Sequence, residues 1–395
     1  MFIVEDNKKL IFNTDNNQVL KASDIIIDIF KSNNKKEVIY DKLCELKIAQ
    51  DYLDTVNNFL SNNVVYIDSS KKCDQLQLII SSVCNLKCRY CYANEGTYNI
   101  KNKYMDWLTC KNALDLFFYN FEYIDTVCFF GGEPTLNEEL IDSACKYLKK
   151  YKNRYKNITM MSNLYNLSDR MISLIKEYDI IVATSLDGVK EINDSYRINH
   201  SNSGTFQQVF NNIKNLKEST DQPKKIEITL TNKHNDIGDI KNSLMNYFNE
   251  ELSIDCFTIN KVVKCYEGDS NIEYNGEIKS DILRDIELFI DKGLLNDEIM
   301  YFIDFILNNN YKYFCNAGLS QFSVLSNGNI YPCQLFATNE HSSFKMGNVN
   351  NKDFFKEKIF IDVKNKLEAY TKSNVCKDCY AKSICHMCAG YNEKL

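Results

Sequence analysis

The chain has 395 residues, with 47 lysines and arginines against 53 aspartates and glutamates, which gives a net charge of −6. This negative balance argues against a nucleic-acid-binding surface, which is usually basic, and no apolar run reaches the roughly 20 residues of a membrane span. Residues 1–4 are followed at once by Glu5, Asp6 and Asn7, which is not a secretion signal. We therefore expect a cytoplasmic protein of two or three domains.

Residues 1–70 predict a small domain of their own. Short apolar runs separated by Asn and Asp turns predict strands, and Ser23 with Asp24 offers an N-cap for a helix. The predicted strands lie at 2–5, 10–13, 18–21 and 63–68. The predicted helices lie at 25–31, 36–46 and 50–61. Three strands, three helices and a last strand are typical of a winged-helix-like domain.

From about residue 75 the pattern changes to strand, loop and helix, repeated. The predicted strands lie at 76–80, 126–130, 158–162, 180–185, 226–231 and 256–259. The predicted helices lie at 107–119, 138–151, 169–178, 206–216 and 240–248, with two more at 282–290 and 298–307. Strands that alternate with helices of this length predict an α/β fold with a parallel sheet. We place this core domain at residues 75–310.

Sixteen cysteines without a secretion signal indicate metal ligation rather than disulfide bonds. Cys84, Cys88 and Cys91 lie on one short loop just after the first strand of the alternating region. Thiolates favour zinc or iron–sulfur chemistry, and three thiolates leave one iron of a [4Fe–4S] cluster free for another ligand. A zinc knuckle or a chance grouping is the alternative on spacing alone.

This triad, with the aromatic Tyr90 before its last cysteine, resembles the C-x3-C-x-aromatic-C signature of radical S-adenosylmethionine (SAM) enzymes. The resemblance implies a partial (β/α)6 TIM-like radical SAM barrel. It also implies that the free iron binds SAM, and that one electron from the cluster cleaves SAM to a 5′-deoxyadenosyl radical. Functional residues of such barrels lie at the carboxyl ends of the strands, where the following motifs also fall.

The second strand ends in Gly131-Gly132-Glu133-Pro134, which matches the GGEP motif of the family. Two glycines let the backbone approach a ligand closely, Glu133 can accept from an ammonium, and Pro134 stiffens the chain. In the family, this backbone and glutamate hold the methionine amine of SAM. The third strand ends in Ser-Asn-Leu where the family more often has Thr-Asn-Gly, so contact of Asn163 with SAM is implied despite a departure at the next residue.

The fourth strand ends in Ser-Leu-Asp-Gly at 185–188, which matches the Ser-x-Asp-Gly of the family. Arg197 follows in a segment that looks like the family's Asp-x-x-Arg. The resemblance implies that Ser185 and Arg197 lie near the ribose and carboxylate of SAM, and the planar fork of a guanidinium suits a carboxylate. An ordinary surface salt bridge is the alternative for Arg197.

Residues 311–395 carry a second group of cysteines. They are Cys315, Cys333, Cys376, Cys379, Cys385 and Cys388. Asn327-Gly328 between apolar runs predicts a hairpin. The pattern resembles the cysteine-rich SPASM domain, which in its family holds two auxiliary [4Fe–4S] clusters. A zinc ribbon is the alternative, since paired C-x2-C units also bind zinc.

The chain departs from the SPASM pattern in three ways. Its last pair is C-x2-C rather than C-x3-C, and a final downstream cysteine is missing. Gln334 follows Cys333, where sulfatase-maturing relatives carry an aspartate that serves as a base. By the family pattern one cluster takes Cys315, Cys333 and Cys388, and the other Cys376, Cys379 and Cys385, each one ligand short. Three completions stay open: a ligand from Cys256 or Cys265, a substrate thiolate on an open iron, or a single cluster on Cys376, Cys379, Cys385 and Cys388.

The resemblances together imply a radical SAM maturase of the SPASM type that acts on a ribosomally made precursor peptide. Residues 1–70 resemble a leader-peptide recognition domain, which takes the leader as an added strand. The implied partners are that peptide and an electron donor such as flavodoxin or ferredoxin, without nucleic acid or membrane. The implied cofactors are SAM, its [4Fe–4S] cluster and one or two auxiliary clusters.

A cysteine thioether is the favoured product, and Gln334 argues against serine or cysteine oxidation of sulfatases. A carbon–carbon or carbon–oxygen cross-link on an aromatic residue is the first alternative. A non-catalytic, zinc-stabilised peptide-binding protein is the alternative from another class, and the GGEP and Ser-x-Asp-Gly matches speak against it.

Overall fold

In this computed structural model the described residues are 2–5, 9–13, 18–21, 72–101, 103–234, 240–262, 272, 293–296, 316–338 and 343–371. The chain divides into two units, which are described separately. One comprises residues 1–67 with 298–312, and the other comprises residues 68–297 with 313–395.

The first unit contains a three-stranded antiparallel sheet in the order β1-β2-β3. Its strands are β1 (Phe2–Glu5), β2 (Lys9–Asn13) and β3 (Gln18–Lys21). The three predicted strands at the start of the chain are therefore confirmed. The helices predicted at 25–31, 36–46 and 50–61, and the strand predicted at 63–68, lie outside the described residues.

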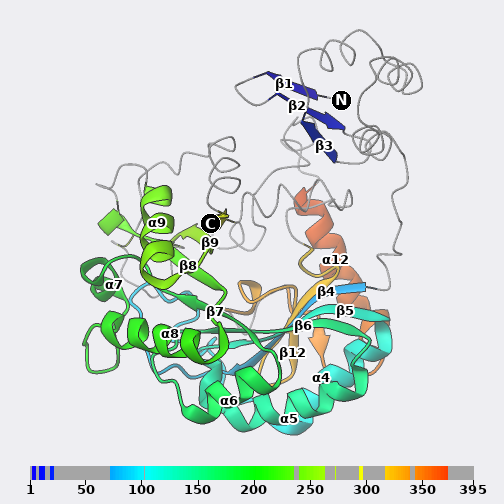
Figure 1. Cartoon of the computed structure of the whole chain (residues 1–395). Coiled ribbons are helices and arrows are strands. Elements are labelled where there is room, and N and C mark those ends of the chain that lie inside the picture. The colour runs from blue at the N-terminus through cyan, green and yellow to red at the C-terminus, as the bar shows by residue number, and fades with distance from the viewer. Residues whose placement is uncertain are drawn as a thin grey trace. The chain divides into compact units, whose positions relative to one another are not determined.

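The second unit is built on one sheet in the order β10-β9-β8-β7-β6-β5-β4-β11-β12-β13 (Figure 1). The strands from β4 to β9 follow one another in chain order and pair in parallel. Their bounds are β4 (Lys72–Ser81), β5 (Tyr123–Gly131), β6 (Tyr155–Ser162), β7 (Ile181–Ser185), β8 (Lys225–Leu230) and β9 (Cys256–Lys261). Parallel strands in chain order place all their carboxyl ends at one edge of the sheet.

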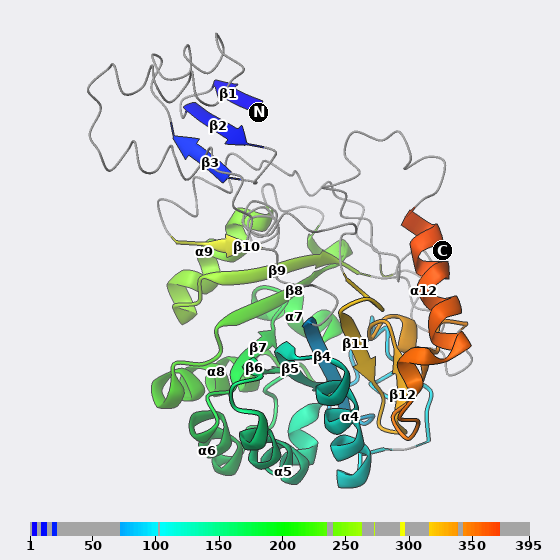
Figure 2. The ribbon, with the colours of Figure 1, turned by 90° about the vertical axis from the view of Figure 1, so that its right-hand side faces the viewer.

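Helices fill the connections between these strands and lie along the outer side of the sheet (Figures 1 and 2). They are α4 (Trp107–Asn120), α5 (Glu138–Leu148), α6 (Asp169–Glu177), α7 (Lys190–Tyr196), α8 (Phe206–Thr220) and α9 (Ile240–Leu252). A further helix, α12 (Lys358–Thr371), ends the described part of the chain. Asp106 and Ser168 cap α4 and α6, since each side chain accepts a backbone N–H of the first turn. Among the described helices, none is both long and apolar enough to cross a membrane.

The α/β prediction with a parallel sheet is confirmed, and the predicted strands and helices of 76–259 are all present. Two helices escaped prediction. Helix α7 has only seven residues, which is too short to display an apolar period. Helix α12 lies in the C-terminal region, where the sequence predicts only the cysteine ligands and the hairpin at Asn327-Gly328. The helices predicted at 282–290 and 298–307 lie outside the described residues.

The C-terminal segment continues the same sheet instead of starting a separate one. Strand β11 (Gln321–Val324) pairs in parallel with β4, and β12 (Asn329–Tyr331) and β13 (Gly347–Asn348) follow antiparallel. Gly328 has a φ of +81° in the turn between β11 and β12, which confirms the hairpin predicted there. Strands from before and after residue 311, where the sequence predicts a domain boundary, therefore belong to one sheet.

The two faces of this sheet differ in character. Phe322 of β11 pairs with Leu76 of β4, and its ring lies 5.3 Å from that of Phe117 on α4, so this row faces the helices. Gln77 of β4 and Ser323 of β11, which pair with each other, lie on the opposite face because side chains alternate along a strand, and the Ser323 hydroxyl donates to Gln77 Oε1 at 2.6 Å. At these strands the face opposite the helices, here called the inner face, carries polar side chains, whereas the face covered by helices carries apolar ones.

Candidate cofactor site

The loop of the cysteine triad leaves β4 at the carboxyl edge of the sheet. A second segment, residues 196–199 after α7, runs beside it and fixes its path. The Lys87 N–H donates to Ile198 O at 2.7 Å, and the Arg89 N–H donates to Tyr196 O at 3.0 Å. The loop is therefore held by backbone hydrogen bonds that do not depend on a bound group.

Cys84, Cys88 and Cys91 are free thiols on this one loop, and each is partly buried. Burial raises the pKa of all three, to about 11 for Cys88, so they are protonated at neutral pH when no cation is near. Within the described part of the chain, no three His, Cys, Asp or Glu side chains are already close enough to hold a metal ion. The donor set nevertheless fits an iron–sulfur cluster, whose positive charge turns buried thiols into thiolates.

The glycines of the GGEP motif are needed for close packing against this loop. A Cβ at Gly132 would lie 2.5 Å from Val83 O, and one at Gly131 would lie 2.2 Å from Ser81 O. Gly96, at a φ of +82°, closes the same contact, since its Cβ would lie 2.4 Å from the Gly132 Cα. We expected these glycines to let the backbone approach a ligand closely. Among the described residues, the backbone that approaches them belongs to the end of β4 and to the triad loop.

Glu133 is fully buried, and its carboxylate is occupied by four donors from the protein. Oε1 accepts from the Thr135 N–H, the Thr135 hydroxyl and the Ser162 hydroxyl, and Oε2 accepts from the Asn163 N–H at 2.8 Å. The side chain therefore ties the end of β5 to the end of β6. We predicted that Glu133 accepts from an ammonium, and this geometry gives it a bracing role as well.

Asn163 stands beside the first cysteine of the triad. Its Nδ2 donates to Asn85 Oδ1 at 2.8 Å and lies 3.6 Å from Cys84 Sγ. The next residue, Leu164, has a φ of +52°, in the left-handed region that favours glycine. This explains the glycine of the commoner family form: Leu164 keeps the same turn at a cost in backbone strain. The buried Asn85 Nδ2 has no hydrogen-bond partner among the described residues.

Arg197 reaches the triad from the end of α7 and is only 7% exposed. Its Nη1 donates to the Tyr90 hydroxyl at 2.9 Å, and Tyr90 in turn donates to Asp187. Burial opposes the charge of Arg197, but Tyr90, Cys88 and Asp187 outweigh it and raise the pKa of the guanidinium. The surface salt bridge considered for Arg197 is therefore wrong. Its Nε atom is buried without a hydrogen-bond partner among the described residues, as expected of a group that awaits an anion.

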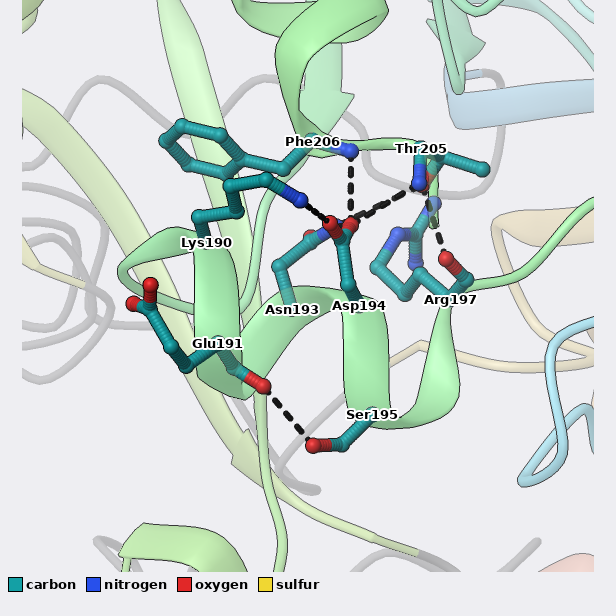
Figure 3. A network of polar contacts seen from close by, with 8 residues as sticks. All are labelled: Lys190, Glu191, Asn193, Asp194, Ser195, Arg197, Thr205 and Phe206. Atoms are coloured by element: carbon teal, nitrogen blue, oxygen red, sulfur yellow. Dashed lines mark hydrogen bonds and ion pairs between the residues drawn. The ribbon is translucent and has the colours of Figure 1, made fainter. Parts of the chain in front are cut away.

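The backbone around Arg197 is set by Asp194 on the preceding turn (Figure 3). Asp194 Oδ1 accepts from the N–H groups of Thr205 and Phe206 at 2.8 Å each, and Oδ2 pairs with Lys190 at 2.5 Å. Thr205 then donates from its hydroxyl to Arg197 O at 2.9 Å. Asp194 thereby joins α7 to the start of α8 and fixes the position at which Arg197 leaves the helix.

We expect Asp194→Ala to lower the free energy of unfolding by about 1–2 kcal/mol at neutral pH, because two N–H groups at the start of α8 lose their acceptor. Burial opposes ionisation of Asp194, but Lys190, the Phe206 N–H and Asn193 hold its pKa below its ordinary value of 3.8. A lowered pKa stabilises the fold above that value, and the benefit is lost as the pH falls through the folded-state pKa. Urea unfolding at neutral and acidic pH measures both effects.

Asp353→Ala is the matched control, since Asp353 is exposed and its ion pair with Lys356 spans 3.1 Å. An exposed pair of this kind contributes about 0.5 kcal/mol or less. Equal losses from the two variants at neutral pH would contradict the role given to Asp194.

The remaining predicted site residues lie as follows. Ser185 is the last residue of β7 and pairs with Glu227 of β8 on the polar face, and Pro134 begins a buried 3-10 turn after β5. Cys333 is buried just after β12. Five predicted ligands lie outside the described residues: Cys315, Cys376, Cys379, Cys385 and Cys388. Prediction from sequence missed Asp187 and Asn85, although both stand inside motifs that were noticed.

Comparison with known families agrees with this geometry. Residues 78–243 match the model of the radical SAM superfamily, and residues 315–380 match SPASM, described as an iron–sulfur cluster-binding domain. The chain contains a radical SAM domain and a SPASM domain. These domains imply [4Fe–4S] clusters and SAM as cofactors and support an enzyme that uses them.

Individual relatives extend the comparison. The chain is 27% identical to the cysteine-type anaerobic sulfatase-maturating enzyme of Clostridium novyi over 333 residues, which cover 77% of this chain and 84% of that protein. Two solved structures share the fold. One is anSMEcpe with bound AdoMet (TM-score 0.65, 21% identity, 79% of this chain and 88% of that one). The other is Streptococcus suis SuiB bound to its precursor peptide SuiA (TM-score 0.59, 16% identity, 98% and 94%).

Proposed function

We propose that this protein is a cytoplasmic radical SAM maturase that installs a cross-link, most simply a cysteine thioether, in a ribosomally made precursor peptide. The observation that carries the proposal is the convergence at one sheet edge of the triad loop, the GGEP turn and the buried Arg197. These elements belong to distant parts of the sequence and meet beside the polar inner face. A peptide segment held on that face would lie beside the residues assigned to the cofactor.

When bound, the cluster of Cys84, Cys88 and Cys91 supplies the electron that cleaves SAM to methionine and the 5′-deoxyadenosyl radical. The protein's own residues position the reactants. Arg197 and Ser185 are assigned to the carboxylate and ribose of SAM, and the GGEP backbone with Asn163 to its methionine end. Tyr90 orients Arg197. Closing the site against water protects the radical from side reactions.

The partner we propose is a precursor peptide with a leader sequence. Residues 1–70 would take the leader as an extra strand, in which main-chain hydrogen bonds give affinity. The sheet β1-β2-β3 has β1 and β3 as its outer strands, beside which a further strand would pair. Two relatives support a peptide partner: one is named a sulfatase-maturating enzyme, and the other was solved with a precursor peptide. A flavodoxin or ferredoxin would supply the electron.

We assign the second group of cysteines to auxiliary clusters that accept the substrate's electron or bind a substrate thiolate. One cluster would use Cys315, Cys333 and Cys388, and the other Cys376, Cys379 and Cys385. Cys256, at the start of β9, remains a candidate for an additional ligand. Iron content of variants at these positions would count the clusters.

The test is the reaction product of the anaerobically reconstituted protein with peptides encoded in short reading frames beside its gene. A thioether removes two hydrogen atoms and makes the joined cysteine resistant to alkylation, and mass spectrometry reads out both changes. Loss of two hydrogens with every cysteine still alkylated would indicate the aromatic cross-link instead. A protein that holds zinc and leaves every peptide unchanged would contradict the proposal.

A further inference from the structure

Asp187 lies in the Ser-x-Asp-Gly motif after β7 and is buried, with 2% of its surface exposed. Both of its carboxylate oxygens are bound by donors. Oδ2 accepts from the Tyr90 hydroxyl, and Oδ1 accepts from the Thr229 N–H of β8 at 3.0 Å. Its backbone is anchored as well, because His234 Nε2 donates to Asp187 O at 2.6 Å. The carboxylate is thus fixed in place and held as an acceptor.

This acceptor sets the direction of a short relay. Tyr90 has one hydroxyl proton, and that proton goes to Asp187. The phenol oxygen therefore presents a lone pair to Arg197, which accepts from Nη1 at 2.9 Å. A guanidinium can only donate, so the contact between Tyr90 and Arg197 exists only while the tyrosine proton points the other way.

The relay leaves one part of Arg197 without a partner. Nη1 is bound to Tyr90, while the buried Nε has no partner among the described residues. A buried donor without a partner is rare in folded proteins and indicates a ligand that is not shown. The planar fork of the guanidinium fits a carboxylate with two parallel hydrogen bonds.

We propose that Asp187 is a positioning residue which, through the hydroxyl of Tyr90, aims Arg197 at the carboxylate of SAM. The inference rests on the proposed function, because it takes SAM as the ligand of this site. Asp187 does not touch SAM in this account. It keeps the guanidinium in one orientation before SAM arrives, so less of the binding energy is lost in ordering the side chain.

The test is Asp187→Asn in the anaerobically reconstituted full chain, with binding of SAM and of decarboxylated SAM measured by calorimetry. Both neighbours of the carboxylate are donors, so an asparagine must turn its NH2 group toward one of them. We expect the Kd of SAM to rise about 10-fold to 100-fold, the range for a lost hydrogen bond to a charged group. The Kd of decarboxylated SAM should change by about twofold or less, because it has no carboxylate for Arg197 to bind.

Two further variants complete the design. Tyr90→Phe removes only the relay hydroxyl and should reproduce the selective loss, so it carries the test if Asp187→Asn fails to fold. Asp115→Asn is the control. Asp115 also accepts from two tyrosine hydroxyls, Tyr147 at 2.6 Å and Tyr151 at 3.0 Å, but it lies on helix α4 and has no contact with Arg197 among the described interactions. Its affinities for both ligands should match the wild type.

Two results would overturn the role of Asp187. One is that Asp187→Asn weakens the binding of SAM and of decarboxylated SAM equally, and the other is that Asp187→Asn and Tyr90→Phe both leave the affinity for SAM unchanged. Neither result would contradict the proposed function. The proposed function fails separately if the wild-type protein binds no SAM or modifies no peptide.

Discussion

Replacing Cys84, Cys88 and Cys91 together with alanine should remove about four irons per chain, the content of one [4Fe–4S] cluster. Formation of 5′-deoxyadenosine from SAM should fall to about 1% of the wild-type rate or less, because the cofactor carries this chemistry and the protein only positions it. The physical reason is that the three thiols of this loop are the protein ligands assigned to the cluster, so the variant has no thiolate left there to hold it. Iron analysis and chromatography of the dithionite-driven reaction check both numbers.

A single pair of variants controls for general damage. Cys88→Ala should behave like the triple variant, whereas Cys145→Ala should keep the iron and the activity. Cys145 is also a free thiol, more deeply buried than Cys88, but it lies on α5 within the helix layer. Retention of wild-type SAM cleavage by the triple variant would disprove the assignment of the loop, whatever its iron content.

Gly132→Ala should be strongly damaging, because it adds a methyl group where the backbone of the triad loop already fills the space. Its Cβ would lie 2.5 Å from Val83 O and 2.7 Å from Val83 C, both backbone atoms that no side-chain rotation can move. Overpacking of this kind costs about 1–3 kcal/mol. The triad loop must also shift, and a displacement near 1 Å at a reacting centre lowers rates by roughly 100-fold. Thermal unfolding and the rate of SAM cleavage measure the two effects.

Gly96 and Gly293 separate the clash from backbone strain. Both have positive φ, +82° and +71°, so alanine at either position costs about 1–2 kcal/mol from the left-handed conformation alone. A Cβ at Gly96 would lie 2.4 Å from the Gly132 Cα, while one at Gly293 meets no described atom within 4 Å. Only Gly96→Ala should impair SAM cleavage. Similar activities for the two variants would show that packing of the loop on the GGEP turn is unimportant.

The fold of the core was largely predictable, because apolar runs of strand length alternate with amphipathic runs of helix length from residue 75 to 259. The motif residues were predictable for a related reason. Gly131 and Ser185 end parallel strands and Asn163 directly follows one, and such ends meet at one edge of the sheet. Local sequence patterns therefore determined which residues gather at the site.

The roles of several residues were not predictable, because they depend on partners distant in sequence. Glu133 is bound by Ser162 at the end of the next strand and by Asn163 just after it, and Asp187 is bound by Tyr90, 97 residues earlier. The parallel pairing of β11 with β4 likewise joins segments about 245 residues apart, such as Gln77 and Ser323 at 2.6 Å. A single sequence shows the chemical type of such residues but not the donors that meet them.

The proposed maturase activity requires the 5′-deoxyadenosyl radical to take a hydrogen atom from a bound peptide. The most direct measurement uses the precursor peptide fully deuterated at its non-exchangeable positions, with mass spectrometry of the 5′-deoxyadenosine formed by the reconstituted wild-type protein. The account predicts one deuterium in 5′-deoxyadenosine for each peptide modified, and none with unlabelled peptide. Unlabelled 5′-deoxyadenosine in the presence of a modified, deuterated peptide would contradict it.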